Sequence, residues 1–258
     1  MKYLSALLYL LCFQSIANDL KIFAVDEPPA SFINEDGAQD GYVIDIIKAI
    51  QERLNDKTNI IFLPEGRALN ILAKDPNSIL MSISRTPPRE QHYYWIAQVM
   101  SKKWQVYTLT NSEIVIETLD DLRALPSIGV VRGDVREEWL INKGFENLNS
   151  VTRHKQNIEK LNLSRVNAIV YEKQGLAYQV NNLGLELSHF KSAFILNEAP
   201  VYIVMSIKSS KQQVKKWQNA FEAIKVNGKL QNIAQNWQLV LLQQYNISSE
   251  IKNNILVF

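Results

Sequence analysis

Hydrophobic residues in the first third of the chain follow two periodicities in turn. Short apolar runs predict buried strands, and apolar residues that recur at helical spacing predict helices between them. The expected strands are residues 20–25, 59–63 and 79–84, and the expected helices are residues 43–54 and 67–74. Because strands and helices alternate, this part of the sequence predicts a parallel sheet with helices on its faces.

A second alternating series follows after Asn111. Here, and in the extended segment before it, we expect strands at residues 103–109, 127–131, 168–171 and 201–205. We expect helices at residues 118–122, 134–140, 158–163, 173–182, 211–226 and 230–237. No long linker separates the two series, and the extended segments near Val106 and Val201 are placed to connect them twice. The pattern therefore indicates two lobes with space for a ligand between them.

The N-terminus has the features of a secretory signal peptide. Lys2 precedes an apolar run at residues 4–13, and Ser15 and Ala17 are small residues at the −3 and −1 positions of a cleavage site after Ala17. The run is too short to span a membrane. An uncleaved anchor is the alternative. Cleavage would remove the only cysteine, Cys12, so the exported chain would be stabilised by its core without disulfides.

Composition excludes several function classes. A net charge of +2 without a run of Lys or Arg argues against a nucleic-acid partner. The three histidines lack metal-ligand spacing, and we interpret His92, His154 and His189 as surface or structural residues. No nucleophile–histidine pair or phosphate-binding loop is present, so the motifs give no support for an enzyme.

The strand expected at residues 79–84 carries two hydroxyl groups. Ser82 and Ser84 are two residues apart, so we expect them on one face of the strand, with Met81 and Ile83 on the other.

A helix is expected to begin directly after this strand. Thr86 is a suitable N-cap, and Pro87 suits the first helical position, which places Arg89 in the first turn. A cation beside two hydroxyl groups and a helix start predicts a binding site for an anion such as a carboxylate. The alternative is that Arg89 and Glu90 are solvated charges.

Four segments occur in order along the chain. They are Gly41-Tyr-Val-Ile-Asp45, Ser82-x-Ser84-x-Thr86-x-x-Arg89, Leu119-Asp-Asp-Leu122 followed by Ile128-Gly-Val-Val-Arg-Gly133, and Gly228-x-Leu230-x-x-Ile233-x-x-x-Trp237. Together they resemble motifs of the bacterial extracellular solute-binding proteins of family 3, the amino-acid-binding type of periplasmic protein. Each motif alone is weak, but their order behind a signal peptide is specific. The resemblance covers roughly residues 20–237.

The resemblance implies an α/β fold of the type II periplasmic-binding-protein class. Two lobes would be joined by two hinge strands and would close on a ligand in the cleft between them. After a signal peptide at residues 1–17, lobe 1 would comprise residues 18–105 and 201–258, and lobe 2 residues 106–200.

The resemblance also implies a set of ligand-binding residues. In relatives the position of Arg89 binds the α-carboxylate of the ligand, aided by Ser82 and Ser84. The position of Asp134 lies at a helix start in lobe 2 whose amides face the carboxylate, and the position of Glu172 binds the ammonium group. Elementary chemistry agrees, because a zwitterion needs a donor fork for its carboxylate and an acceptor-only group for its ammonium.

Two regions of lobe 1 depart from the family pattern. Pro28-Pro29 replaces an aromatic residue that lies on the ligand in many relatives, and Phe32 is the nearest candidate to take its place. A packing role is the alternative for Phe32. Glu65 occurs near the position where many relatives have an aromatic residue before Arg67. One interpretation is that Glu65 or Arg67 contacts the ligand, and the alternative is that both are solvated charges at a helix start.

Two positions of lobe 2 also depart from the pattern. Asp134 stands where a neutral Thr or Ser is usual, and its charge would repel a carboxylate unless it only caps the helix. Glu172 is one methylene longer than the usual Asp. Arg132 and Arg136 could add positive field at the cleft, or one of them could pair with a neighbouring glutamate.

We therefore expect a periplasmic substrate-binding protein. It would capture a small polar solute, an amino acid or a related carboxylate, for the membrane permease of an ABC importer. One alternative is an enzyme on the same scaffold, since a few relatives resemble cyclohexadienyl dehydratases, and another is an orphan or sensory binding protein with a separate membrane partner. We expect a monomer that binds without catalysis and uses no cofactor, metal or nucleic acid.

Overall fold

The computed structural model describes residues 19–258, so the expected signal peptide and Cys12 lie outside the described residues. The strands are β1 (Lys21–Ala24), β2 (Phe32–Ile33), β3 (Gln39–Asp40), β4 (Ile60–Phe62), β5 (Ser78–Ser84), β6 (Tyr93–Leu109), β7 (Ile128–Val131), β8 (Leu148–Val151), β9 (Ala168–Tyr171), β10 (Phe190–Ser206), β11 (Glu250–Lys252) and β12 (Ile255–Val257). The helices are α1 (Tyr42–Leu54), α2 (Glu65–Lys74), α3 (Leu119–Ala124), α4 (Val135–Asn142), α5 (His154–Asn162), α6 (Lys173–Asn182), α7 (Lys211–Val226) and α8 (Lys229–Tyr245), with 3₁₀ turns η1 (Pro87–Arg89) and η2 (Leu187–His189).

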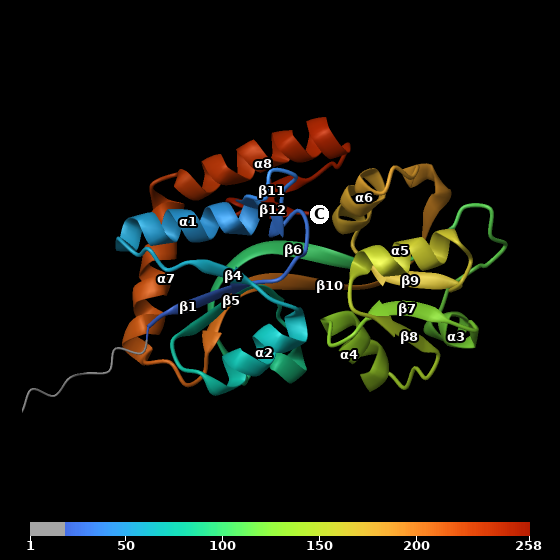
Figure 1. The fold of residues 1–258 in the computed structure, drawn as a ribbon, viewed down its shortest axis with the longest axis horizontal. Helices are drawn as coiled ribbons and strands as arrows, with labels where there is room; N and C mark the ends of the chain where they lie inside the picture. Colours follow the sequence, from blue (N-terminus) through green and yellow to red (C-terminus); the bar gives the residue numbers. More distant parts are fainter. Residues whose placement is uncertain (1–18) are drawn as a thin grey trace, which may run out of the picture.

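Two long strands connect the halves of the molecule. β6 and β10 pair antiparallel from Tyr93 opposite Ser206 to Leu109 opposite Phe190, and both run from one half into the other (Figure 1). They lie in the middle of the strand order β4-β1-β5-β10-β6-β9-β7-β8. The sequence predicted only one end of each strand, because the remainder lacks a clean two-residue alternation. The α/β fold with two lobes is as predicted.

Each half has its own hydrophobic core. In the first, α1, α7 and α8 cover one face of β1, β5 and β10, and α2 covers the other face. In the second, α3 and α4 pack on one face of β7 and β9, and α5 and α6 pack on the other. Val43, Ile46, Ile47 and Ile50 of α1 are fully buried, which follows from their helical spacing.

The backbone of β5 is irregular at Ser82. This residue has a φ of 65°, which is uncommon for a residue with a side chain, and the pairing of β5 with β10 shifts register nearby. The irregularity reverses the alternation of side chains. Met81 packs in the core with α1, whereas Ile83 packs on the opposite face with Leu80. The prediction that Met81 and Ile83 share a face is therefore wrong.

The helix predicted after Thr86 is also wrong. The chain forms only the single 3₁₀ turn η1, and the Thr86 side chain accepts no capping hydrogen bond. Pro87 and Pro88 remove two amide donors, and no helical hydrogen-bond ladder follows. Arg89 is still held in place, because its amide donates to the Thr86 carbonyl at 2.9 Å. Any anion binding at Arg89 therefore draws on the guanidinium and not on a helix dipole.

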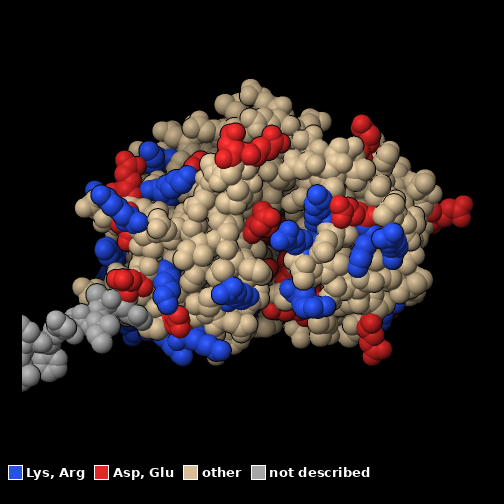
Figure 2. Space-filling view, viewed as in Figure 1, with Lys and Arg blue, Asp and Glu red and all other residues tan. Residues whose placement is uncertain are grey.

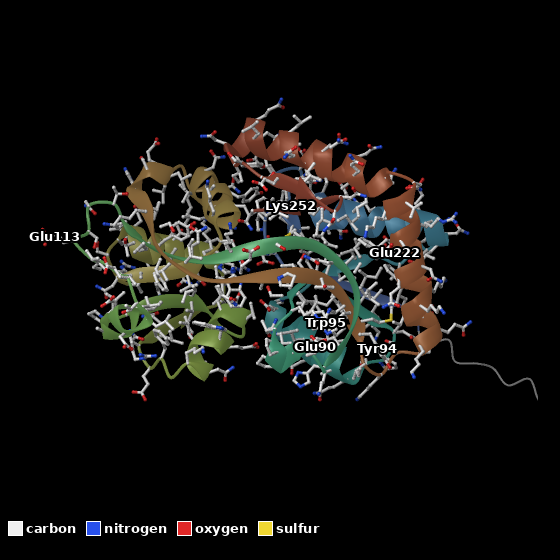
Figure 3. All side chains as sticks on the ribbon, turned by 180° about the vertical axis from the view of Figure 1, so that it is seen from behind. Glu90, Tyr94, Trp95, Glu113, Glu222 and Lys252 are labelled. Carbon is white, nitrogen blue, oxygen red and sulfur yellow. The ribbon has the colours of Figure 1, made fainter. Side chains whose placement is uncertain are left out.

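The C-terminal tail extends the sheet beside the hinge. β12 pairs in parallel with β6, with Leu256 opposite Met100, and β11 pairs with β12. From behind, Lys252 of this hairpin lies near the hinge strands (Figure 3). Leu256 is buried, and its amide donates to the Tyr42 hydroxyl at 3.2 Å, so the tail closes the core over α1. Within residues 19–258, no helix has the length and apolar character needed to cross a membrane.

Candidate functional site

The two halves meet where β1, β5, β7 and β9 end, and ligands commonly bind at the carboxyl ends of parallel strands. Acidic and basic side chains lie side by side along this junction (Figure 2). A cavity of about 10 Å³, room for roughly one water molecule, remains between the halves, which are closed on each other. It is lined by Val25, Glu27, Glu65, Ser82, Ile83, Ser84, Arg89, Asp134, Val135 and Arg136.

Arg89 joins the two halves through an ion pair. Its side chain is 6% exposed, and its Nε and Nη2 donate to the Glu138 Oε2 at 3.0 and 2.7 Å. Glu138 comes from α4 in the opposite half, and Glu65 of α2 lies 3.8 Å away on the near side. Burial alone would lower the pKa of Arg89, but Glu65 and Glu138 more than offset this and raise it, so the guanidinium stays charged.

A second cluster of charges surrounds Arg136. Its guanidinium forms ion pairs with Asp134 and Glu172 of its own half, and it approaches Glu27 of the opposite half at 3.5 Å. Lys102 of β6 contacts Glu27 at 2.8 Å and Glu172 at 3.9 Å. Burial alone would raise the pKa values of Asp134 and Glu172, but Arg136 lowers both, and Lys102 lowers that of Glu172 further. Both acids are therefore ionised near neutral pH.

His154 lies against this cluster. Its ring stacks on Tyr171 at 3.9 Å, and the Arg136 guanidinium lies 5.4 Å from the centre of the Tyr171 ring. Burial, followed by the charge of Arg136, lowers the pKa of His154 to about 3, so the imidazole is neutral. Of the two interpretations, surface or structural, the structural one therefore applies to His154. No group of three or more His, Cys, Asp or Glu side chains among residues 19–258 has an arrangement that could hold a metal ion.

Several buried polar atoms have no hydrogen-bond partner within the described part of the chain. Two of them, Ser82 Oγ and Arg89 Nη1, belong to residues that line the cavity. Buried polar atoms in folded proteins are normally hydrogen-bonded. The cavity is therefore lined by two residues that each keep an unused donor. This arrangement suits a polar ligand with acceptor atoms.

The buried charges of the site nearly cancel. The cations are Arg89, Lys102 and Arg136, and the acids are Glu27, Glu65, Asp134 and Glu172. Burial, and the nearby charge of Asp134, raise the pKa of Glu65 to about 8. Glu65 is then largely protonated at neutral pH. Burial also raises the pKa of Glu27, although the charge of Lys102 opposes this.

Four of the predicted site residues line the cavity: Ser82, Ser84, Arg89 and Asp134. Glu172 lies in the adjoining cluster with Arg136. Phe32 does not line the cavity. Its ring lies in the core, with its centroid 5.0 Å from that of Tyr178 and 6.4 Å from that of Trp237. Arg67 is exposed and also lies outside the lining. The role of each residue in binding stays a prediction.

Sequence reasoning missed Glu27, Lys102 and Glu138. The sequence did contain one signal for Lys102. Residues 102, 104 and 106 lie on the same buried face of β6, and Trp104 and Val106 are apolar. A lysine on an inward face needs an acidic partner. No comparable signal marked Glu27, which lies in an irregular loop, or Glu138, one of two adjacent glutamates at a helix start.

A family comparison decides the class of this protein. The family model described as bacterial extracellular solute-binding proteins, family 3, matches residues 21–240. The chain belongs to this family. A comparison with curated proteins gave no match.

Solved structures show the fold expected for a family 3 solute-binding protein. A histidine kinase sensor domain with similarity to periplasmic binding proteins has a TM-score of 0.76 at 15% identity, covering 85% of this chain and 96% of that one. A mutant of ArgBP from T. maritima has a TM-score of 0.73 at 16% identity, with 84% and 94% covered. An ABC uptake transporter substrate-binding protein from Streptococcus pneumoniae with bound histidine has 0.72 at 18% identity, with 84% and 92% covered.

Glu65 makes the stability of this solute-binding protein depend on pH. In the folded chain it keeps a proton up to about pH 8, whereas its ordinary pKa is 4.5. The folded state therefore binds more protons than the unfolded state in this window, and the free energy of unfolding falls as pH rises through it. Between pH 6.5 and 8.5 we expect the free energy of unfolding of wild type to fall by about 2 kcal/mol more than that of Glu65→Gln.

Urea unfolding of both proteins at these two pH values measures the difference. Glu90→Gln is the matched control, because Glu90 is exposed and its hydrogen bond to Arg85 lowers its pKa, away from this window. Equal pH dependence in wild type and Glu65→Gln would show that Glu65 is ionised throughout.

Proposed function

We propose that this protein captures a small polar solute that carries a carboxylate, an amino acid or a close relative, in the periplasm. We propose further that it delivers the solute to the permease of an ABC importer. The carrying observation is Arg89, a buried and charged guanidinium at the junction of the lobes whose Nη1 has no partner in the described chain. A planar donor fork in this setting is suited to a carboxylate.

The charges of the site favour a solute with no net charge or with one positive charge. With Glu65 protonated and Glu27 ionised the buried charges balance, and a zwitterion keeps that balance because it adds one charge of each sign. With Glu65 ionised, a solute of net charge +1 would restore it. A dicarboxylate would add uncompensated negative charge to a buried site, which is costly. Relatives support an amino acid, since one neighbour is described with bound histidine and another is an arginine-bound ArgBP.

A thermal-shift screen of amino acids and related small acids tests this proposal. A solute that binds only the folded state stabilises it by about 2.7 kcal/mol at a hundred times its dissociation constant. Each stabilising solute is then compared with its amide, which lacks the carboxylate charge, and with its deaminated analogue. We expect the amide to leave the melting temperature unchanged. A screen in which no amino acid or small acid raises the melting temperature would refute the proposal.

A sensory role is the second candidate. The observation that favours it is the likeness to a histidine kinase sensor domain, which covers 85% of this chain. Crosslinking in intact cells separates the two roles, because capture of a permease supports transport and capture of a membrane kinase supports sensing.

We propose binding without turnover, and recovery of the solute unchanged after long incubation is the expected result. We also propose that the protein is a monomer.

A further inference from the structure

The Arg89–Glu138 pair, here called the interlobe pair, joins a buried group to an accessible one. The Arg89 side chain is 6% exposed and the Glu138 side chain is 44% exposed. Arg89 belongs to the turn η1 of the first lobe and Glu138 to α4 of the second. The pair can therefore form only while the lobes are closed, and Glu138 can turn into solvent when they open.

Glu138 uses the donor edge that a free carboxylate would use. Arg89 Nε and Nη2 both donate to Glu138 Oε2, at 3.0 and 2.7 Å. One edge of a guanidinium accommodates one carboxylate in this way. A solute carboxylate bound at the same edge therefore competes with the Glu138 carboxylate.

We propose that Glu138 is an internal competitor for the carboxylate site, which holds the lobes closed without solute and leaves Arg89 when a carboxylate solute binds. The first part of this proposal, that the interlobe pair holds the solute-free lobes closed, is here called the closing step and depends on that pair alone. The second part, that a solute carboxylate displaces Glu138, is called the displacement step. It rests on the proposed function, because it requires a solute with a carboxylate.

Glu138 accepts hydrogen bonds from only some of the donors in the site. Arg89 Nη1 and Ser82 Oγ are buried without a hydrogen-bond partner in the described chain, although both residues line the cavity. Glu138 is tethered to α4 and reaches the guanidinium from the rim. An untethered carboxylate has access to these remaining donors as well. Exchange of one carboxylate for another also leaves the charge at Arg89 unchanged, so displacement costs little electrostatically.

The competition lowers the apparent affinity for solute. If solute enters the open form, its apparent dissociation constant is the intrinsic one divided by the open fraction. Loss of a charge-assisted hydrogen bond in Glu138→Gln is expected to raise the open fraction of the solute-free protein by about 10-fold. The apparent affinity for a carboxylate solute is expected to rise by a similar factor.

Distance measurements between spin labels test the closing step without any solute. The full chain carries Cys12→Ser, with labels at Asn70→Cys and Lys143→Cys, two exposed positions on α2 and at the end of α4 (Figure 1). We expect Glu138→Gln to shift the distances towards longer values, and Arg89→Gln to do the same. The double variant is expected to shift no further than either single variant, because both remove one interaction.

Glu146→Gln is the matched control. It removes one negative charge from the same lobe, but Glu146 is exposed and precedes β8, at the end of the sheet opposite Asp134. We expect it to leave the distances unchanged. Identical distance distributions in wild type and Glu138→Gln would overturn the proposal.

The same labelled proteins, mixed with the standard amino acids, separate this inference from the proposed function. If Glu138 competes, an amino acid that raises the melting temperature of the labelled protein will do so at a lower concentration in Glu138→Gln than in wild type. An equal or higher required concentration in Glu138→Gln would overturn the displacement step. Amino acids that leave every variant unaffected would refute the proposed function, and the displacement step with it, while the solute-free distances still decide the closing step.

Discussion

Arg89→Ala is expected to weaken solute binding at least about 100-fold while the protein stays folded. The guanidinium is the only buried cation among the cavity-lining residues of the first lobe, and its replacement removes both the charge and the donor fork. The affected solute carboxylate would lose its charge-assisted hydrogen bonds and would face the carboxyl groups of Glu65 and Glu138 instead. Calorimetry with the best solute from the thermal-shift screen measures the loss.

The fold is expected to tolerate this substitution because both partners of Arg89 can adapt. Glu138 is half exposed and can turn into water, and Glu65 is already protonated at neutral pH. Arg85→Ala is the matched control. Arg85 precedes the same turn, but its guanidinium pairs with Glu90 and lies over Trp95, away from the cavity. An unchanged affinity in Arg89→Ala would remove Arg89 from the site, and a lost affinity in Arg85→Ala would show that the effect belongs to the turn as a whole.

The sequence predicted the fold well where one periodicity was strong. The helix α7 spans Lys211–Val226, the range that was expected, because its apolar residues recur cleanly and Ser210 caps its start. The strand β8 was missed, since Leu148–Val151 contains two polar residues and pairs only at the sheet edge. The length of β6 was missed as well, because long-range pairing with β10 and β12 sustains residues that have no regular alternation of their own.

The candidate site was harder to predict because its contacts are between lobes. The Ser82 to Arg89 stretch pointed to an anion site from local chemistry alone, and Arg89 does lie in the cavity. The acid that reaches it from the second lobe is Glu138, which no segment of the sequence marked. Glu172, which the family resemblance assigns to the ammonium group of the ligand, is paired with Arg136 and Lys102. Such a pairing depends on how two lobes meet, which spacing within one segment does not determine.

Asp134 shows how a local departure can have a local explanation. Its carboxylate stands where the family resemblance implies a neutral residue, and it was expected either to repel a solute carboxylate or only to cap the helix. In the structure it does cap α4, accepting from the Arg136 amide at 2.8 Å, and it also pairs with the Arg136 guanidinium. The charge that Asp134 adds is thus balanced two residues later. Asp134 and Arg136 act as one unit, which leads to a stability prediction.

Arg136→Met is expected to destabilise the protein by about 3–5 kcal/mol. Methionine keeps much of the side-chain volume but leaves Asp134, Glu172 and Glu27 facing one another with Lys102 as the remaining nearby cation. Uncompensated charge in a buried site is the dominant cost, so the loss should exceed that of an exposed arginine by several-fold. Urea unfolding measures it, with Arg132→Met as the control, since Arg132 is exposed and lies four residues earlier in the same segment.

Two further measurements distinguish electrostatics from packing as the cause. Arg136→Met combined with Glu172→Gln should recover part of the lost stability, because the second change removes one of the unbalanced charges. The loss in Arg136→Met should also shrink as pH falls towards 4. In wild type Arg136 lowers the pKa values of Asp134 and Glu172, so both stay ionised as pH falls. Without Arg136, burial raises the pKa values of these acids. The folded variant then binds protons that folded wild type does not bind, and this stabilises the variant relative to wild type at low pH. A loss that is independent of pH and unaffected by Glu172→Gln would assign the role of Arg136 to its packing on Tyr171 instead of its charge.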